Sequence, residues 1–355
     1  MTVAAERGIL RALFAALADR RSAATLVDGP ALLPVARRHR LTPLLSVRCR
    51  GALPPAFDAV CRQDHVRTVA RNLALAVVAE ECVAALAKAG VDTALLKGLA
   101  YERTLYAHDG GRPTSDIDLL VRERDRRAAF AVLDGLGFEP KAAAPGFDDA
   151  DYHEVAWRRD GVEIDLHMAL APYVRCAIDY DEVWRGMRPL ALGAARAFVL
   201  APTHAAVFHA LHMAIDHFDV PGLYLTDLAR LVPDAAALDA ARVAARAWRC
   251  RRPLETSVIL ASAFCASWAA AERGPSPPFP AGRVVAAFGG IAPVRRAEQL
   301  LRKFAHFDGP VDAFRYTAVQ GRRHVRELFE RKVRRRSPSS RLHIGERASR
   351  AAPRR

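Results

Sequence analysis

The chain has 355 residues, of which 51% are hydrophobic and 26% are charged, and its formal net charge is +14. This composition is typical of an ordinary globular protein, and the length predicts roughly two folded units. No run of 18 or more apolar residues occurs, which argues against a membrane-spanning protein.

The first 21 residues carry charge throughout an apolar pattern. They lack the order of regions of a secretory signal, so they are expected to form an amphipathic helix. The six cysteines are scattered and include no C-x-x-C pair. This pattern favours reduced, mostly buried thiols over a disulfide framework or a zinc site. We therefore expect a cytoplasmic protein.

Residues 1–90 are predicted to form an N-terminal helical segment. Apolar residues recur at helical spacing from Pro54 to Lys88, and Gly90 supplies a stop signal. The pattern then changes, because Val91–Leu96 is a short apolar strand candidate. A short helix is expected over Lys97–Tyr106, followed by turn residues.

Residues 91–200 are expected to form a compact α+β core. Apolar and polar residues alternate from Asp116 to Val121, as in a strand with one polar end, and a helix is predicted over 124–136. Two further strands, Tyr152–Arg158 and Val162–His167, are joined by a turn containing Asp160-Gly161, which is a strong hairpin signal. A third strand is predicted over about 189–199.

Residues 201–332 are predicted to form a C-terminal helical domain that opens at Pro202-Thr203, with Thr203 as a candidate N-cap. Residues 333–355 are expected to be a disordered basic tail. Residues 331–355 hold ten Lys or Arg and one Glu, so they account for +9 of the net charge. The tail could contact acidic partners such as phosphates, or it could simply be solvated.

Two carboxylates, Asp116 and Asp118, stand at positions i and i+2. On a strand this spacing places both on one face. Two carboxylates this close repel each other, and a divalent cation such as Mg²⁺ would offset the repulsion. The later strand supplies Asp165 as a third ligand that could also help to deprotonate an acceptor hydroxyl, with Glu163 as the alternative. His167 shares that face and could orient the site or touch a nucleotide.

A strand-to-helix junction at Lys97-Gly98 precedes these carboxylates. Glycine at such a junction lets the backbone approach a phosphate, and a helix N-terminus offers free N–H groups. Lys97 and Arg112 are therefore candidates for binding triphosphate oxygens.

The segment from Leu95 to Val121, LLKGLAYERTLYAHDGGRPTSDIDLLV, resembles the signature of an uncharacterised nucleotidyltransferase family, a branch of the polymerase-β-type superfamily. The segment VEIDLH resembles that family's third-carboxylate strand, and His209, His212 and Asp227 follow in the order expected of its helical region. The similarity covers roughly residues 90–235. One departure is Leu99, where many superfamily members have Gly or Ser.

This resemblance implies a polymerase-β-like core, a small mixed sheet with flanking helices, framed by the N- and C-terminal helical segments. It implies a two-metal mechanism with two Mg²⁺ ions and an NTP such as ATP as donor. The metal-ligand and catalytic roles fall on Asp116, Asp118 and Asp165, and the donor-phosphate roles fall on Lys97, Gly98 and Arg112. Ser115 and His167 are further candidates for binding the donor. The acceptor would be a small molecule, peptide or protein sooner than nucleic acid. The acceptor, the donor base and the oligomeric state are left open.

Two alternatives belong to other functional classes. The first is a catalytically inactive nucleotidyltransferase fold that senses nucleotides or binds a protein. The second is a nucleic-acid-associated protein that uses the basic tail. His209 and His212, at i and i+3 of one predicted helix, could share a face, but core histidines are commoner than transition-metal ligands.

Overall fold

The computed structural model describes residues 1–265, apart from 28, 108, 142–152, 173–174 and 216–217, together with 307–308, 311, 313–314 and 317–318. Five helices come first: α1 Val3–Ala18, α2 Arg20–Ala23, α3 Leu32–Arg38, α4 Thr42–Arg48 and α5 Pro55–Lys88. Pro55 suits the first position of α5, because proline lacks an N–H group and its φ angle is already helical. At 34 residues α5 is about 51 Å long.

A seven-stranded mixed sheet follows, in the order β3-β4-β5-β2-β1-β7-β6. Its strands are β1 Ala94–Leu95, β2 Ile117–Leu120, β3 Glu139–Pro140, β4 Glu154–Arg159, β5 Val162–His167, β6 Arg188–Leu192 and β7 Ala195–Val199. The central strand β2 pairs in parallel with β5 and antiparallel with β1. Every residue of β2 is buried, as expected of a strand covered on both faces.

The remaining helices cover the sheet and extend the core. Helix α6 Lys97–Leu105 follows β1, η1 Glu123–Asp125 and α7 Arg126–Gly135 follow β2, and α8 Tyr180–Arg185 precedes β6. After the sheet come α9 Pro202–Ile215, α10 Leu223–Leu231, α11 Ala235–Ala247 and α12 Arg251–Ser262. One continuous hydrophobic cluster includes buried residues from the N-terminal helices, the sheet and α9 to α12.

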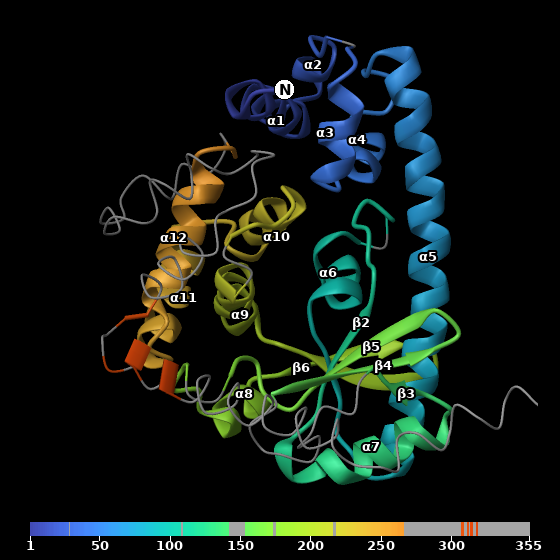
Figure 1. The fold of residues 1–355 in the computed structure, drawn as a ribbon, viewed down its shortest axis with the longest axis vertical. Helices are drawn as coiled ribbons and strands as arrows, with labels where there is room; N and C mark the ends of the chain where they lie inside the picture. The colour runs from blue at the N-terminus through green and yellow to red at the C-terminus, as the bar shows by residue number, and fades with distance from the viewer. Residues whose placement is uncertain are drawn as a thin grey trace, which may run out of the picture.

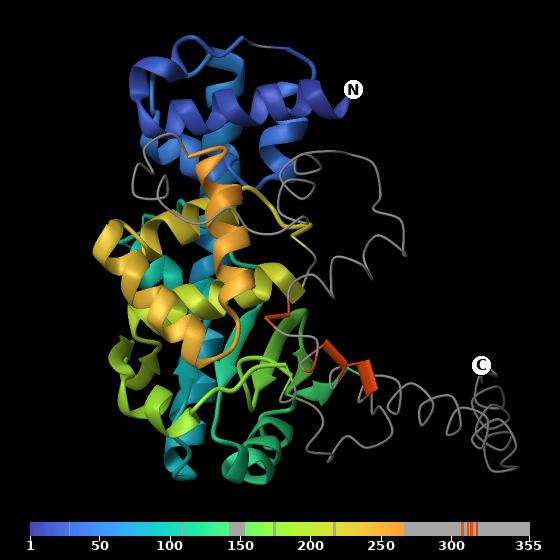
Figure 2. The ribbon, with the colours of Figure 1, turned by 90° about the vertical axis from the view of Figure 1, so that its left-hand side faces the viewer.

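The elements are stacked along the long axis of the molecule. Helices α1 to α4 lie at one end, the sheet and α7 lie towards the other, and α9 to α12 lie between them on one side (Figures 1 and 2). Helix α5 runs along most of this length and contacts both the N-terminal helices and the sheet (Figure 1). Helix α5 thereby connects the sheet to the N-terminal helices.

The α+β fold class predicted from the sequence is confirmed. Strand β5 has the predicted bounds, and Asp160 and Gly161 form the tight turn before it, both with positive φ. The single strand predicted over 189–199 is wrong, because β6 and β7 form a hairpin there. Gly193, with φ 59°, allows a two-residue turn inside a stretch whose alternation does not reveal it.

The other predictions from the sequence have mixed outcomes. Helix α9 begins at Pro202, so Thr203 lies inside its first turn and is not the N-cap. In the described part of the chain, no helix combines the length and the hydropathy that crossing a bilayer requires. The division at residues 91 and 201 stays a prediction, and the basic tail at 333–355 lies outside the described residues.

His39, at the end of α3, joins the N-terminal helices to α10. It is 3% exposed, and its Nδ1 accepts a hydrogen bond of 3.0 Å from the Gly222 N–H. The His39 carbonyl accepts a second bond of 3.0 Å from Leu223. Burial, assisted by the charge of Arg38, lowers the pKa of His39 from 6.5 to about 4. An accepting Nδ1 requires the neutral ring, so this junction excludes the imidazolium.

We expect the junction to lose stability in acid. The pKa of His39 is lower in the folded protein than in the unfolded chain, so its full contribution to the free energy of unfolding is present above pH 6.5. This contribution is lost as the pH falls towards 4, because the unfolded chain takes up the proton first. Between pH 7 and pH 5 this amounts to about 1–2 kcal/mol of the free energy of unfolding. Urea unfolding at both pH values should show a smaller acid loss in His39→Gln. An identical loss in both proteins would contradict the assignment.

Candidate active site

The three carboxylates singled out in the sequence meet at the inner strands β2 and β5 of the sheet. Asp118 on β2 lies opposite Asp165 on the parallel strand β5, and Asp116 immediately precedes β2. The parallel register places Asp118 and Asp165 on the same face, because side chains alternate with a period of two. All three line one cleft.

Asp118 is the most deeply buried of the three, at 4% exposure. The Lys97 ammonium lies 2.9 Å from its Oδ1, and the Nε2 of His167 lies 3.1 Å from the same oxygen. Burial opposes ionisation of Asp118, but Lys97 and the hydrogen bond from His167 outweigh it and hold its pKa well below the ordinary value. Asp118 is therefore an ionised carboxylate with an internal counterion.

Asp116 and Asp165 are in the opposite electrostatic situation. Burial, and then the negative charge of Asp118, raises the pKa of Asp116, although Ser115 donates a 3.1 Å hydrogen bond to its Oδ1. Burial and the charges of Asp118 and Asp116 raise the pKa of Asp165 to about 6. The cleft thus contains more negative charge than Lys97 neutralises, and this is the condition that favours a bound cation.

A further carboxylate, Glu154 on β4, belongs to the site and was missed in the sequence. It pairs in register with His167 across the β4–β5 hairpin, and its Oε2 lies 3.3 Å from His167 Nδ1. The imidazole therefore lies between the carboxylates of Glu154 and Asp118, and its Nε2 is hydrogen-bonded to Asp118. The signal was available, because the Asp-Gly turn sets the hairpin register.

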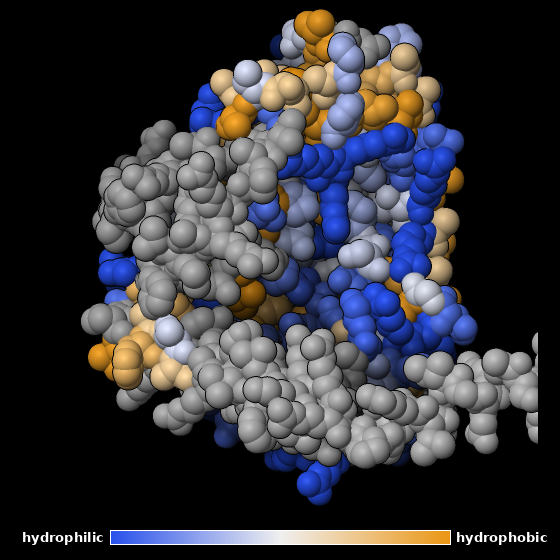
Figure 3. Space-filling model, in the orientation of Figure 1, coloured by the Kyte–Doolittle hydropathy of each residue, from blue (hydrophilic) through white to orange (hydrophobic). Residues whose placement is uncertain are grey.

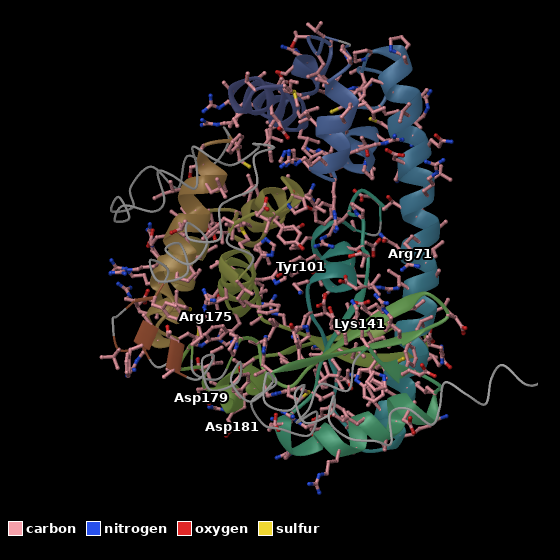
Figure 4. The ribbon with its side chains drawn as sticks, in the orientation of Figure 1. Arg71, Tyr101, Lys141, Arg175, Asp179 and Asp181 are labelled. Atoms are coloured by element: carbon pink, nitrogen blue, oxygen red, sulfur yellow. The ribbon has the colours of Figure 1, made fainter. Side chains whose placement is uncertain are left out.

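Glu163, the alternative third ligand, is engaged elsewhere. It accepts hydrogen bonds from Lys141 Nζ, labelled in Figure 4, at 3.1 Å and from Arg158 Nε at 2.7 Å, and it does not line the cleft. Of the two candidates on β5, Asp165 is the one that reaches the site.

The junction between β1 and α6 forms one wall of the cleft. Lys97 has a positive φ of 27°, and Gly98 interrupts the helical geometry of α6. A Cβ atom at position 98 would lie only 2.9 Å from the Thr114 side chain, so glycine permits this close approach. Leu99 is 2% exposed and belongs to the hydrophobic core, whereas Thr114 and Ser115 line the cleft.

Arg112 is held by the protein itself. It is 4% exposed, and its Nη2 and Nε donate to the two carboxylate oxygens of Asp227 on α10 at 2.9 and 3.1 Å. Its Nη1 donates to the Gly98 carbonyl at 3.2 Å, and the guanidinium lies 5.3 Å from the ring centre of Tyr101, which is labelled in Figure 4. Arg112 therefore ties α6 to α10, in contrast to the donor-binding role expected from the sequence.

The turn that leads into β2 is fixed from α5. The Asn72 side chain donates to the Arg112 carbonyl at 2.9 Å and accepts from the Thr114 N–H at 3.2 Å. The nitrogen and the oxygen of one side-chain amide thus both bind the backbone of this turn. Arg71, labelled in Figure 4, donates to the Ser115 carbonyl at 3.0 Å. Both residues were missed in the sequence, because nothing local relates them to a turn forty residues away.

The cleft has a volume of about 320 Å³. Figure 3 shows hydrophilic residues around a hollow on this face, between the N-terminal helices at the top and the sheet below. His212 and Tyr224 close the side formed by α9 and α10. His209 is 1% exposed and donates from Nε2 to the Tyr224 carbonyl at 2.9 Å, so it is a buried structural histidine.

The donor set suits a hard divalent cation in its chemistry, because carboxylate oxygens are the ligands that Mg²⁺ prefers. Burial and the charge of Asp118 raise the pKa of both Asp116 and Asp165. In the described residues, no three His, Cys, Asp or Glu side chains are already gathered closely enough to hold a metal ion. A cation would therefore have to draw the carboxylates together.

The chain is similar to known proteins both in sequence and in structure. The sequence model of a family described as uncharacterised nucleotidyltransferases matches residues 25–266. No curated protein sequence matches. Among solved structures, the chain is similar to the antibiotic-resistance factor ANT(2'')-Ia, with 13% identity, a TM-score of 0.37, and coverage of 49% of this chain and 92% of that one. It is also similar to an antigenic nucleotidyltransferase-like protein from Paracoccidioides brasiliensis, with 18% identity, a TM-score of 0.29, and coverage of 46% and 75%.

Proposed function

This chain belongs to the family of uncharacterised nucleotidyltransferases, and on that premise we propose that it transfers a nucleotidyl group from an NTP to a hydroxyl acceptor. The observation that supports the proposal is the register of β2 and β5, which brings Asp118 and Asp165 side by side in a cleft that Asp116 also lines. The acceptor in this proposal is a small molecule, peptide or protein.

Mg²⁺ is the proposed cofactor. Asp116 and Asp118 would hold two ions, and Asp165 would share the one on the acceptor side. When bound, the ions would neutralise negative charge on the phosphate oxygens. His167 would keep Asp118 in position through the hydrogen bond of 3.1 Å, while Gly98 allows the backbone at the start of α6 to approach the donor phosphates.

The proposed reaction is an in-line displacement. The acceptor oxygen forms a bond to the α-phosphorus of the NTP, and the bond from that phosphorus to the oxygen bridging to the β-phosphate breaks. Pyrophosphate leaves with the bonding electron pair. Asp165 accepts the proton of the acceptor hydroxyl, since it is the least neutralised carboxylate of the site.

A second candidate function, a catalytically inactive nucleotide-binding fold, is favoured by one observation. Lys97 forms an ion pair with Asp118 at 2.9 Å, on the carboxylate that a metal ion would need. If that ion pair persists with nucleotide bound, the chain would bind NTP without turnover.

We expect NTP binding to require the metal ion. Calorimetry of the full chain with ATP, GTP, CTP and UTP should give at least about tenfold tighter binding of one NTP with Mg²⁺ than with EDTA, because the carboxylate-lined cleft repels a free triphosphate. Pyrophosphate release in the presence of hydroxyl acceptors then distinguishes the enzyme from the inactive fold. Binding without release across the acceptors would support the second candidate, and a lack of binding to every NTP would contradict both.

A further inference from the structure

The cations that were expected to bind the donor triphosphate are already neutralised. Lys97 pairs with Asp118, and Arg112 pairs with Asp227 through both carboxylate oxygens. A triphosphate carries several negative charges and needs positive partners in addition to metal ions. The cleft must therefore obtain a cation from another part of the chain.

Arg40, which immediately follows the C-cap of α3, is such a cation. It lines the cleft although it comes from the N-terminal helices and not from the sheet. Among the described residues no carboxylate forms a salt bridge with it, and its side chain is half-buried. Burial and the charge of Asp118 raise the pKa of Asp116, and Arg40 is one of the cations that oppose this rise, so its charge acts on the carboxylate site.

A second recess of about 370 Å³ begins where Arg40 stands. It shares Arg40 and the segment Pro113–Ser115 with the cleft, so the two spaces meet at this arginine. Its lining also includes Arg37 and Arg67, and Asp64 is the one carboxylate in that lining. Arg37 donates to both oxygens of Asp64, at 2.9 and 3.0 Å, and Arg67 forms a salt bridge of 3.6 Å with the same carboxylate, so one negative charge faces two arginines. The recess is therefore basic overall, and an anion entering from the cleft would meet Arg40 first.

The backbone at Arg40 is one that normally selects glycine. Its φ is 55°, and the Leu41 and Arg40 N–H groups donate to the Ala36 and Arg37 carbonyls, both at 2.9 Å. This is the Schellman ending of a helix, in which the left-handed residue is usually glycine because it has no Cβ. An arginine at this position is less favourable for the backbone than a glycine would be.

The same helix ending recurs at Arg249, after α11. Its φ is also 55°, with the Cys250 and Arg249 N–H groups donating to the Ala245 and Arg246 carbonyls at 2.8 and 3.1 Å. Arg249 is exposed and lines neither recess. The chain therefore contains a matched control with the same residue and the same backbone geometry.

We propose that Arg40 binds the phosphate oxygens of the donor's polyphosphate tail, which extends from the carboxylate site towards the basic recess around Arg37 and Arg67. The inference rests on the proposed nucleotidyl transfer. It adds that the N-terminal helices complete the donor site, with one cation presented across the turn Pro113–Ser115.

The experiment compares wild type, Arg40→Gly and Arg249→Gly in the full chain. Both substitutions place glycine at a left-handed helix ending, so neither should lower the Tm by a backbone effect. Calorimetry would use MgATP, AMP and inorganic tripolyphosphate as probes. We expect Arg40→Gly to weaken MgATP and tripolyphosphate binding by about tenfold or more, as the loss of a charge-assisted hydrogen bond predicts, and to change AMP binding less than about twofold. Arg249→Gly should bind all three like wild type.

Unchanged MgATP affinity in Arg40→Gly would overturn the proposal. So would a loss confined to tripolyphosphate, because the anion site would then serve a substrate other than the donor. Equal losses for AMP and MgATP would also overturn it, since the contact would not be with the tail. If wild type binds tripolyphosphate through Arg40 but binds no NTP, nucleotidyl transfer fails as the function while the anion site remains, so the two failures can be told apart.

Discussion

Replacing Asp116 with Ala should abolish Mg²⁺-dependent pyrophosphate release while leaving the fold intact. In the proposed mechanism Asp116 holds both ions, and losing a direct ligand should cost more than the roughly 10–100-fold that loss of an outer-shell partner typically costs. We therefore expect a fall in kcat of more than about a hundredfold.

Stability should be nearly unchanged in this variant for a specific reason. Asp116 is half-exposed, and its side chain accepts a hydrogen bond from Ser115. Burial and the charge of Asp118 raise its pKa. Removing it relieves repulsion and leaves no buried cation without a partner. Asp118 would be a poorer choice, because its loss would leave Lys97 buried without its carboxylate. Asp134→Ala, an exposed carboxylate on α7, is the control and should retain full activity. Full activity in Asp116→Ala would refute the mechanism.

The second large effect concerns stability and involves Arg112 and Asp227. Removing either partner alone should lower the free energy of unfolding by about 3–5 kcal/mol, because the other charge would stay buried without compensation. Asp227 is fully buried, and its Oδ1 also accepts a 2.8 Å hydrogen bond from the Tyr106 hydroxyl. Replacing Asp227 therefore removes one hydrogen bond of the Tyr106 hydroxyl, which keeps its contact with Thr226, and leaves the Arg112 guanidinium without its carboxylate.

Urea unfolding of Arg112→Met, Asp227→Leu and the double variant would test this. The double variant should be more stable than the sum of the single losses implies, since replacing both charges by apolar groups leaves no buried ion. Lys141→Ala, which breaks an exposed pair with Glu163, should cost less than about 1 kcal/mol. Losses that simply add in the double variant would show that the pair is not coupled.

The sequence contained enough local information to predict the central part of the fold. The bounds of β5 follow from strict alternation and from the Asp160-Gly161 turn, and the same alternation placed Asp118 and Asp165 on matching faces. The hairpin of β6 and β7 was not predicted, because both strands and their turn share one apolar stretch. Periodicity gives the face of a residue, but it does not reveal a turn of two residues.

The features of the candidate site that depend on local sequence were predicted, and those that depend on contacts between distant segments were missed. Asp109 and Asp116 are the acidic residues near Arg112 in the sequence, but Arg112 pairs with Asp227, 115 residues away, and that buried pairing could not be inferred. Arg40 lies among arginines on a helical segment and carries no motif. Glu154 was accessible in principle through the hairpin register, but that inference needs the register to be known first.

The hydrogen bonds from α5 to the turn before β2 limit how the chain could be shortened. A fragment starting at residue 91 would keep all seven strands, yet it would lose the amide of Asn72 that bonds to the Arg112 carbonyl and the Thr114 N–H. Those backbone groups are buried, and without partners they would favour another path for the turn. If the turn took another path, Asp116 would no longer lie close to Asp165. The first ninety residues are in this sense the scaffold against which the carboxylates are aligned, and a fragment without them is expected to be inert.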